Sequence, residues 1–206
     1  MLEHSRELYF ALDLVAFLAV IALHMVKTNR SLIRLYFVQS LVVTLFLAWL
    51  GFAENDRGLL IVAFVTFIVK VIVAPRFFAR LIHRYGTRFT ANNYLSTPLT
   101  LVVLMLLVLF SYSNVFLPLG MLMPEAFGLL PLNLAAILLS IFLLINRKGA
   151  FSQMIGIFSL ENSILLLASV VGIKQPVALE MGILFDIAIW MIIAQVFISM
   201  MYRQFG

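Results

Sequence analysis

Three charged residues fall near the centres of long apolar stretches of the chain: Lys70, Glu161 and Asp186. Each lies about ten residues into its stretch, which corresponds to about 15 Å along an α-helix. If these stretches cross a bilayer, one ammonium and two carboxylates share the depth of its midplane. An ionisable group at that depth costs about 2.5–3.5 kcal/mol on insertion scales, so such groups usually face a bundle interior and mark a functional pathway.

The chemistry that these groups favour is proton transfer. Burial and an opposite charge act on the protonation of a carboxylate in opposite directions, so a lysine–acid pair can be poised between two protonation states. We expect Lys70 to pair with Glu161 or Asp186. Polar neighbours are expected to hold connecting waters (Gln39, Asn162 and Ser163). The predicted proton relay comprises Lys70, Glu161, Asp186, Glu180, Asn162 and Gln39. The alternative interpretation is a structural one, in which these charges form buried ion pairs or bond to the backbone.

Other ionisable residues have simpler interpretations. Glu180 and Asp13 lie closer to the outer edge of the bilayer, and Asp13 is expected to make an interfacial or partner contact. His24 is expected to be packed or interfacial. Arg76 and Arg80, together with Arg84, are spaced four apart and form one basic helical face, which favours binding to anionic lipid over docking of a cytoplasmic subunit.

The composition requires a membrane environment. Apolar residues make up 64% of the 206 residues and charged residues only 11%, against roughly half and a quarter in soluble domains. A globule this small could not hide so much apolar surface from water. The composition therefore excludes a soluble enzyme, a nucleic-acid-binding domain and a disordered tail, and it favours a multi-pass protein of the cell inner (cytoplasmic) membrane.

Seven apolar stretches are long enough, or nearly so, to span about 30 Å of hydrocarbon. Alternating strands are absent, so the expected fold is all-α, a polytopic bundle of seven transmembrane helices. We expect a single membrane domain in which residues 1–97 form a three-helix N-terminal segment and residues 98–206 a four-helix segment. The predicted spans are residues 8–26, 31–52, 59–81, 98–117, 128–145, 151–171 and 177–202.

Lysine and arginine residues predict the orientation of the chain. Ten of them lie in the first, third and fifth connections and the C-terminus, whereas the N-terminus and the other connections hold three. Because cytoplasmic loops carry the excess of basic residues, the N-terminus is expected outside and the C-terminus inside. The net charge of +5 is interpreted as loop charge rather than as a sign of nucleic-acid binding.

The sequence offers no residues for bound redox chemistry. It has no cysteine, and its three histidines lack the spacing of metal ligands. Phosphate-binding loops, nucleophile elbows and nucleotide fingerprints are absent as well. No catalytic residue, metal ligand or cofactor is therefore assigned to this chain.

Two C-terminal segments resemble a known family. Residues 153–162, Gln-Met-Ile-Gly-Ile-Phe-Ser-Leu-Glu-Asn, are similar to the glutamate-bearing helix of complex I subunit K. Residues 179–186, Leu-Glu-Met-Gly-Ile-Leu-Phe-Asp, follow in the position of that family's next acidic helix. The subunit K glutamate falls at Phe158, and Glu161 lies almost one turn further on.

The closer resemblance is to hydrogenase-4 component E, a membrane subunit of formate-hydrogenlyase-type complexes, and it covers about residues 30–200. Residues 36–41, Tyr-Phe-Val-Gln-Ser-Leu, are similar to the second helix of that family. Residues 63–70, Ala-Phe-Val-Thr-Phe-Ile-Val-Lys, followed by Pro75, are similar to its lysine-bearing third helix. Glu161-Asn162 and the pair Glu180 and Asp186 are similar to its C-terminal motifs.

This resemblance implies a subunit without catalysis of its own. Such subunits lie between a quinone-site-like membrane arm, beside a [NiFe] hydrogenase or related oxidoreductase, and antiporter-like membrane subunits. They carry part of a chain of buried acids and lysines through which redox chemistry is coupled to ion pumping. The [NiFe] centre and the iron–sulfur clusters would belong to peripheral hydrogenase-type partner subunits.

Two alternatives are open at this point. A stand-alone secondary transporter would need a substrate cavity, often with inverted repeats and broken helices. A structural membrane anchor of an antiporter-type complex would use the charges as assembly pairs. The coupling ion, H⁺ or Na⁺, and the host complex are also open.

Overall fold

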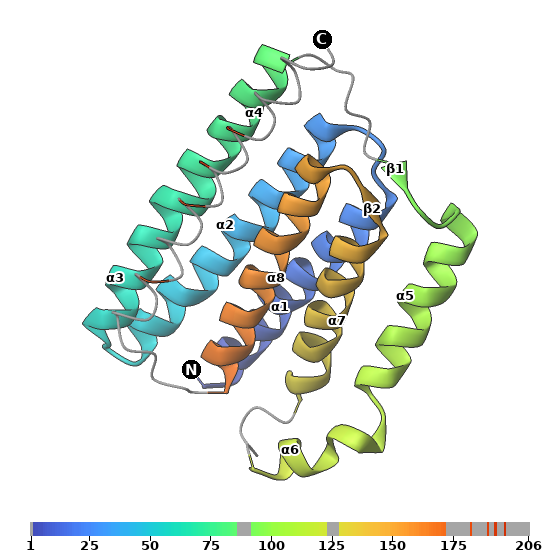
Figure 1. The fold of residues 1–206 in the computed structure, drawn as a ribbon. Helices are drawn as coiled ribbons and strands as arrows, with labels where there is room; N and C mark the ends of the chain where they lie inside the picture. The colour runs from blue at the N-terminus through green and yellow to red at the C-terminus, as the bar shows by residue number, and fades with distance from the viewer. Residues whose placement is uncertain are drawn as a thin grey trace.

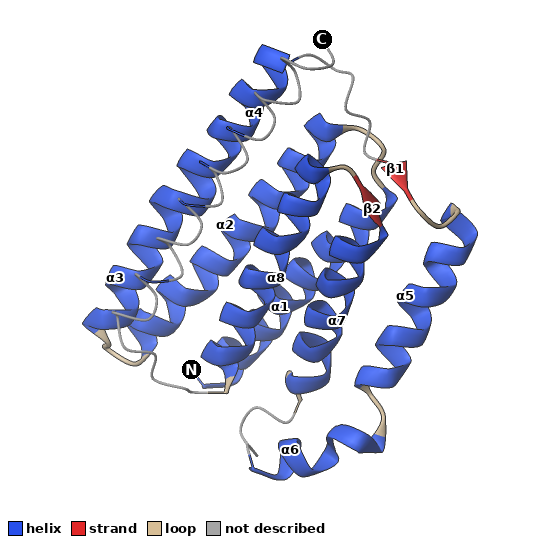
Figure 2. Ribbon diagram, in the orientation of Figure 1, coloured by secondary structure: helices blue, strands red, loops and turns tan. Residues whose placement is uncertain are grey.

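The computed structural model describes residues 2–85, 92–122 and 128–171 and four single positions, 182, 189, 192 and 196. This part of the chain is a bundle of helices with one minimal strand pair, which confirms the all-α fold class (Figures 1 and 2). The predicted seventh span, residues 177–202, lies outside the described residues apart from those single positions.

Four helices form the centre of the bundle: α1 (Leu2–Met25), α2 (Asn29–Ala53), α7 (Leu130–Asn146) and α8 (Ala150–Val170). Helix α7 packs closely on α8, α1 packs on α2 and α7, and α2 also packs on α8. Figure 1 shows these helices between a long outer helix beside α2 and helix α5 beside α7. Side chains on the faces that these four helices turn toward one another are therefore enclosed by protein.

The long outer helix is a continuous run of three segments. It consists of α3 (Arg57–Thr66), a π-helical segment η1 (Phe67–Val73) and α4 (Ala74–Tyr85). After β1 (Asn92–Asn93), the chain continues through α5 (Thr97–Ser111), a 3₁₀ turn η2 (Asn114–Phe116) and α6 (Leu117–Leu122). Strand β2 (Arg147–Lys148) pairs with β1 in antiparallel register.

Four described helices are long and apolar enough to cross a membrane, and they coincide with predicted spans one, two, three and six. They are Glu7–Met25, Asn29–Ala53, Arg57–His83 and Ala150–Val170. The fourth predicted span is instead a pair of helices, Thr97–Ser111 and Asn114–Met121, bent by 40° at a break. If that pair counts as one span, the described residues provide five candidates.

The fifth predicted span, residues 128–145, corresponds to α7, which has 17 residues. A straight helix of this length covers about 26 Å, slightly less than the hydrocarbon core. Pro131 stands in its first turn, where the missing N–H costs nothing. The described residues therefore confirm a bundle with four or five candidate membrane helices. The predicted number of seven spans stays a prediction.

Local signals explain where α2 and α3 begin. The Thr28 hydroxyl accepts a hydrogen bond from the Ser31 N–H at the start of α2. The Asp56 carboxylate accepts bonds from the N–H groups of Gly58 and Leu59 at 2.8 and 3.2 Å at the start of α3. Both are ordinary N-caps, and each turns the chain back after a connection of only a few residues.

One end of the bundle gathers the basic residues, and we call it the basic end. Helix α1 ends there, α2 begins there, and α7 turns into α8 there (Figure 1). Its basic residues are Lys27, Arg30, Arg34, Arg76, Arg80, Arg147 and Lys148. Arg76 and Arg80 are exposed on α4, as the predicted basic helical face requires, and the side chain of Arg84 lies outside the described residues.

Arg147 differs from its neighbours because its side chain is buried. Its guanidinium donates a hydrogen bond to the carbonyl of Leu23, near the end of α1. Burial lowers the pKa of the Arg147 guanidinium to about 10, so the group stays charged at neutral pH. Together with the β1–β2 pairing, this bond ties α1 and the connection before α5 to the α7–α8 turn.

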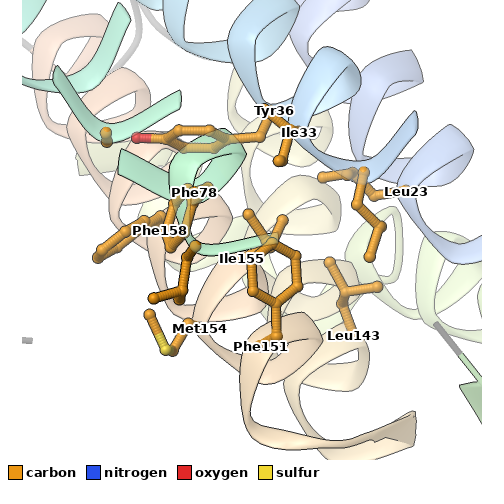
Figure 3. Packing of buried hydrophobic residues seen from close by; sticks show 12 residues of the cluster. Leu23, Ile33, Tyr36, Phe78, Leu143, Phe151, Met154, Ile155 and Phe158 are labelled. Atoms are coloured by element: carbon orange, nitrogen blue, oxygen red, sulfur yellow. The ribbon is translucent and has the colours of Figure 1, made fainter. Parts of the chain in front are cut away.

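The apolar core divides into clusters at different heights. The cluster near the basic end joins α1, α2, α4, α7 and α8 and is rich in aromatic rings (Figure 3). Within it, the Phe78 ring lies 5.4 Å from the rings of both Phe151 and Phe158. We call this the aromatic cluster. It comprises Leu23, Leu32, Ile33, Tyr36, Ala74, Phe78, Leu81, Leu143, Phe151, Met154, Ile155 and Phe158.

Candidate functional site

The structure brings Lys70 into contact with Glu161, although 91 residues separate them in sequence. The Lys70 Nζ lies 3.6 Å from Glu161 Oε2 and donates a hydrogen bond of 3.1 Å to Asn162 Oδ1. The Lys70 side chain is 1% exposed and that of Glu161 is 17% exposed. The predicted pairing of the Lys70 ammonium with the Glu161 carboxylate is therefore present, and Asn162 is a second direct partner of Lys70.

Lys70 lies at the centre of the π-helical segment η1. The following Ala74 N–H bonds to the Val69 carbonyl, five residues back, as in a widened helical turn. Pro75 gives a physical reason for the widening, because its ring lacks an N–H and clashes with the carbonyl four residues before it. The Arg76 guanidinium donates to the nearby Ile72 carbonyl at 3.1 Å. Short π segments in long helices are often associated with functional sites.

Helix α2 completes the surroundings of the pair. Asn162 Nδ2 donates to Ser40 Oγ at 2.9 Å, and Gln39 Nε2 donates to the Ser159 carbonyl at 3.3 Å. These α2 and α8 side chains are buried. The sequence left two roles open for Gln39, a contact between helices and a part in the relay. In the structure its side chain bonds from α2 to α8, and it directly precedes Ser40, which accepts the bond from Asn162.

A group of three serines extends the network to α7. Ser140 Oγ lies 3.1 Å from Ser159 Oγ and 3.2 Å from Ser163 Oγ, and Ser163 also donates to the Ser159 carbonyl at 3.0 Å. We refer to the whole set as the polar network. It comprises Gln39, Ser40, Lys70, Ser140, Ser159, Glu161, Asn162 and Ser163. It joins η1, α2, α7 and α8 inside the bundle.

Sequence reasoning missed three members of this network: Ser40, Ser140 and Ser159. A serine in an apolar helix carries little information, since its hydroxyl readily bonds to its own helix. Two signals were nevertheless present. Ser159 and Ser163 are four residues apart and so share a helix face, and Ser40 directly follows Gln39.

Asp186 and Glu180, the other two acids of the predicted relay, lie outside the described residues. Their predicted positions at the midplane and near the outer edge stay predictions.

Asp13 and His24 are both buried in α1. Asn133 Nδ2 donates a 2.7 Å bond to Asp13 Oδ2, and Asp13 is 1% exposed. The expectation of an interfacial or partner contact for Asp13 was therefore wrong, because its partner lies on α7 of the same chain. His24 is packed, as expected, with Nε2 3.0 Å from the Leu139 carbonyl and its ring stacked on Phe142.

No group of three or more histidine, aspartate or glutamate side chains suited to a metal ion occurs among the described residues. The described site is thus built of one ammonium, one carboxylate, amides and hydroxyls. Such groups bind and pass protons and polarise water. The fold and the site together define a helical membrane protein with a buried charged network.

The comparisons with known proteins add one distant relative. The chain is 25% identical over 179 residues to an uncharacterized protein, Rv0085, of Mycobacterium tuberculosis, and the match covers 86% of this chain and 81% of that protein. No protein-family model matches the chain. No solved structure matches it either.

Proposed function

We propose that this chain is a non-catalytic membrane subunit of a complex-I-like or group 4 [NiFe]-hydrogenase complex. In this proposal its buried charges form one section of the ion-translocation pathway that couples redox chemistry to ion pumping. The proposal includes seven transmembrane helices, an outside N-terminus and an inside C-terminus in the cell inner membrane.

The observation that carries the proposal is the contact of Lys70 with Glu161 and Asn162 inside the bundle. A buried ion pair is not in itself a strong source of stability, because desolvation offsets its Coulombic attraction. A pair whose partners also bond to a polar network across four segments is better suited to shifting charge. A change of charge next to Lys70 would alter the proton affinity of Glu161, and the network would transmit the change.

The resemblance to hydrogenase-4 component E supports the choice of host complex. The segment with Lys70 is similar to the lysine-bearing third helix of that family, and Glu161-Asn162 and the pair Glu180 and Asp186 are similar to its C-terminal motifs. Antiporter-like membrane subunits, a quinone-site-like membrane subunit and peripheral hydrogenase-type subunits would be the partners, with membrane lipids around them. Nickel, iron and iron–sulfur clusters would reside in those partners.

The experiment that tests the proposal is substitution within the assembled complex. Glu161→Gln and Lys70→Ala should each abolish coupled ion pumping while the complex still assembles. Glu54→Gln, which neutralises an exposed acid, is the matched control and should leave pumping intact. Unchanged pumping and coupled turnover in both network variants would refute the proposal.

A charge swap separates the relay from a structural anchor. Lys70→Glu combined with Glu161→Lys restores an ion pair, so an anchor would regain full function. A relay would not, because the proton-accepting group would stand on the wrong helix.

A further inference from the structure

Asp13 is a second buried carboxyl, which the Lys70–Glu161 pair does not include. The bond that Asp13 receives comes from a neutral amide, Asn133, which also donates to the Leu129 carbonyl at 3.1 Å. An amide compensates a buried negative charge much less than an ammonium does. The surroundings of Asp13 are thus suited to a carboxyl that takes up and releases a proton.

Asp13 lies farther from the basic end than the polar network does. Ser140 contacts the network, and Asn133 lies seven residues before it on α7, about 10.5 Å farther from the basic end at 1.5 Å per residue. Asp13 itself is six residues, or about 9 Å, from Glu7, where the apolar part of α1 begins. The Asp13–Asn133 pair therefore stands between the network and the end of the bundle opposite the basic end.

Apolar side chains fill the interval between the two, and two of them are alanines. Ala136 lies on the same face of α7 as Asn133 and Ser140, because these residues are spaced by three and four. Ala16 follows Asp13 by almost one turn on α1, and both alanines are buried. Two waters between two polar groups make three hydrogen bonds of about 2.8 Å each and span about 8 Å, so an interval of about 10 Å would need two or three waters.

The basic-end side of the network is closed in a different way. Phe158 and Ile155 precede Ser159 on α8, and Leu143 follows Ser140 on α7; all three belong to the aromatic cluster (Figure 3). Tyr36 contributes a hydroxyl to that cluster, one turn from Ser40. Within the described residues, the aromatic cluster lies on the basic-end side of the network, whereas Asp13 and its partner Asn133 lie on the opposite side, among apolar side chains.

We propose that the network exchanges protons with the end of the bundle opposite the basic end, through Asp13. This inference rests on the proposed function and adds the ion and the side from which it enters. The groups facing Glu161 are the Lys70 ammonium from η1 and, on α2, Tyr36 near Ser40; the group facing Asp13 is Asn133 of α7. The ion is H⁺ rather than Na⁺, since an ammonium already occupies the cation position beside the Glu161 carboxylate.

The test uses the full chain in liposomes of known orientation with dicyclohexylcarbodiimide as the probe. This reagent adds to the protonated form of a buried carboxyl and leaves an N-acylurea that mass spectrometry locates. Labelling of Glu161 should be lost when the pH on the Asp13 side is raised and should not respond to the pH on the basic-end side. Excess Na⁺ should not protect Glu161.

Four variants locate the route. Asp13→Asn and Ala136→Leu, which fills the interval, should each uncouple Glu161 labelling from the pH on the Asp13 side. Asp13→Glu should keep the response, and Glu54→Gln, at the same end of the bundle, is the control. Gel filtration of each variant verifies that the chain is folded.

Three results would overturn the inference. They are labelling of Glu161 that follows the pH on the basic-end side, a wild-type response in folded Asp13→Asn, and protection by Na⁺. None of these removes the proposed function, which concerns the assembled complex. Glu161 that stays unlabelled at every pH on both sides would instead count against both.

Discussion

Burial of the Lys70 ammonium costs free energy of solvation, and its two partners on α8 explain how the fold tolerates this cost. The ammonium meets a carboxylate at 3.6 Å and an amide oxygen at 3.1 Å. Removing one member of a buried pair leaves the other charge uncompensated, whereas removing both charges is often nearly neutral. The pair therefore makes a sharp prediction about stability that is independent of any partner subunit.

We predict that Lys70→Met destabilises the isolated chain by about 3–5 kcal/mol, whereas Lys70→Met combined with Glu161→Gln returns close to the wild type. The free energy of unfolding of each variant is measured on the purified chain in mixed micelles with an increasing fraction of denaturing detergent. Strictly additive effects of the single changes would show that the two groups do not interact in the folded chain.

At the scale of residues, the similar expected depth of Lys70 and Glu161 in the membrane predicted the site. Lys70 and Glu161 lie at similar distances from the ends of their spans, and the structure brings them together. The serines were not predictable, because a hydroxyl in a membrane helix bonds as readily to its own turn as to a neighbour. Asp13 was misjudged because distance from a span end says nothing about which face of α1 is covered.

Helices α7 and α8 approach each other closely at Gly156. A Cβ built at this position would lie 3.1 Å from both the N and the Cα of Leu144. Backbone atoms cannot move aside as a side chain does, so the helices would have to separate. The close approach brings Ser140 within reach of Ser159 and Ser163.

We predict that Gly156→Ala destabilises the chain by about 1–3 kcal/mol through overpacking. Gly128→Ala is the matched control, because nothing lies within 4 Å of a Cβ at that glycine. Thermal aggregation of both variants in the same detergent provides the comparison. Equal stability of the two variants would mean that the α7–α8 contact accommodates the methyl group.

At the scale of elements, hydropathy predicted the four long helices but not their local shape. The break between α5 and the following short helices lies where Ser113 and Asn114 interrupt an otherwise apolar run, and Pro118 follows. Apolarity alone does not detect such a bend. The π segment around Lys70 is equally invisible to hydropathy, since it changes hydrogen bonding without changing composition.

For the molecule as a whole, the basic end provides the orientation. The chain has no cysteine, so single cysteines report cleanly on each side. We predict that, in intact cells, an impermeant maleimide labels Glu54→Cys, whereas Lys27→Cys is labelled only after the membrane is opened. The reverse pattern would contradict the positive-inside orientation. Tags at the two termini should also lie on opposite sides if the helix count is odd.

The scale of the molecule is also where the sequence is weakest. Short connections and caps such as Asp56 predict antiparallel neighbours, and α1, α2, α7 and α8 indeed form a closed group. The sequence of this chain does not name the partner that covers its outer faces, because that partner is another chain. The claim of a subunit in a larger complex therefore needs a direct measurement.

That measurement is purification of a tagged chain from its native membrane in a mild detergent, with identification of the chains that come with it. The account predicts antiporter-like membrane subunits together with a nickel–iron or complex-I-like peripheral arm. A protein that purifies alone, stable and monodisperse, would contradict the account and favour an independent transporter.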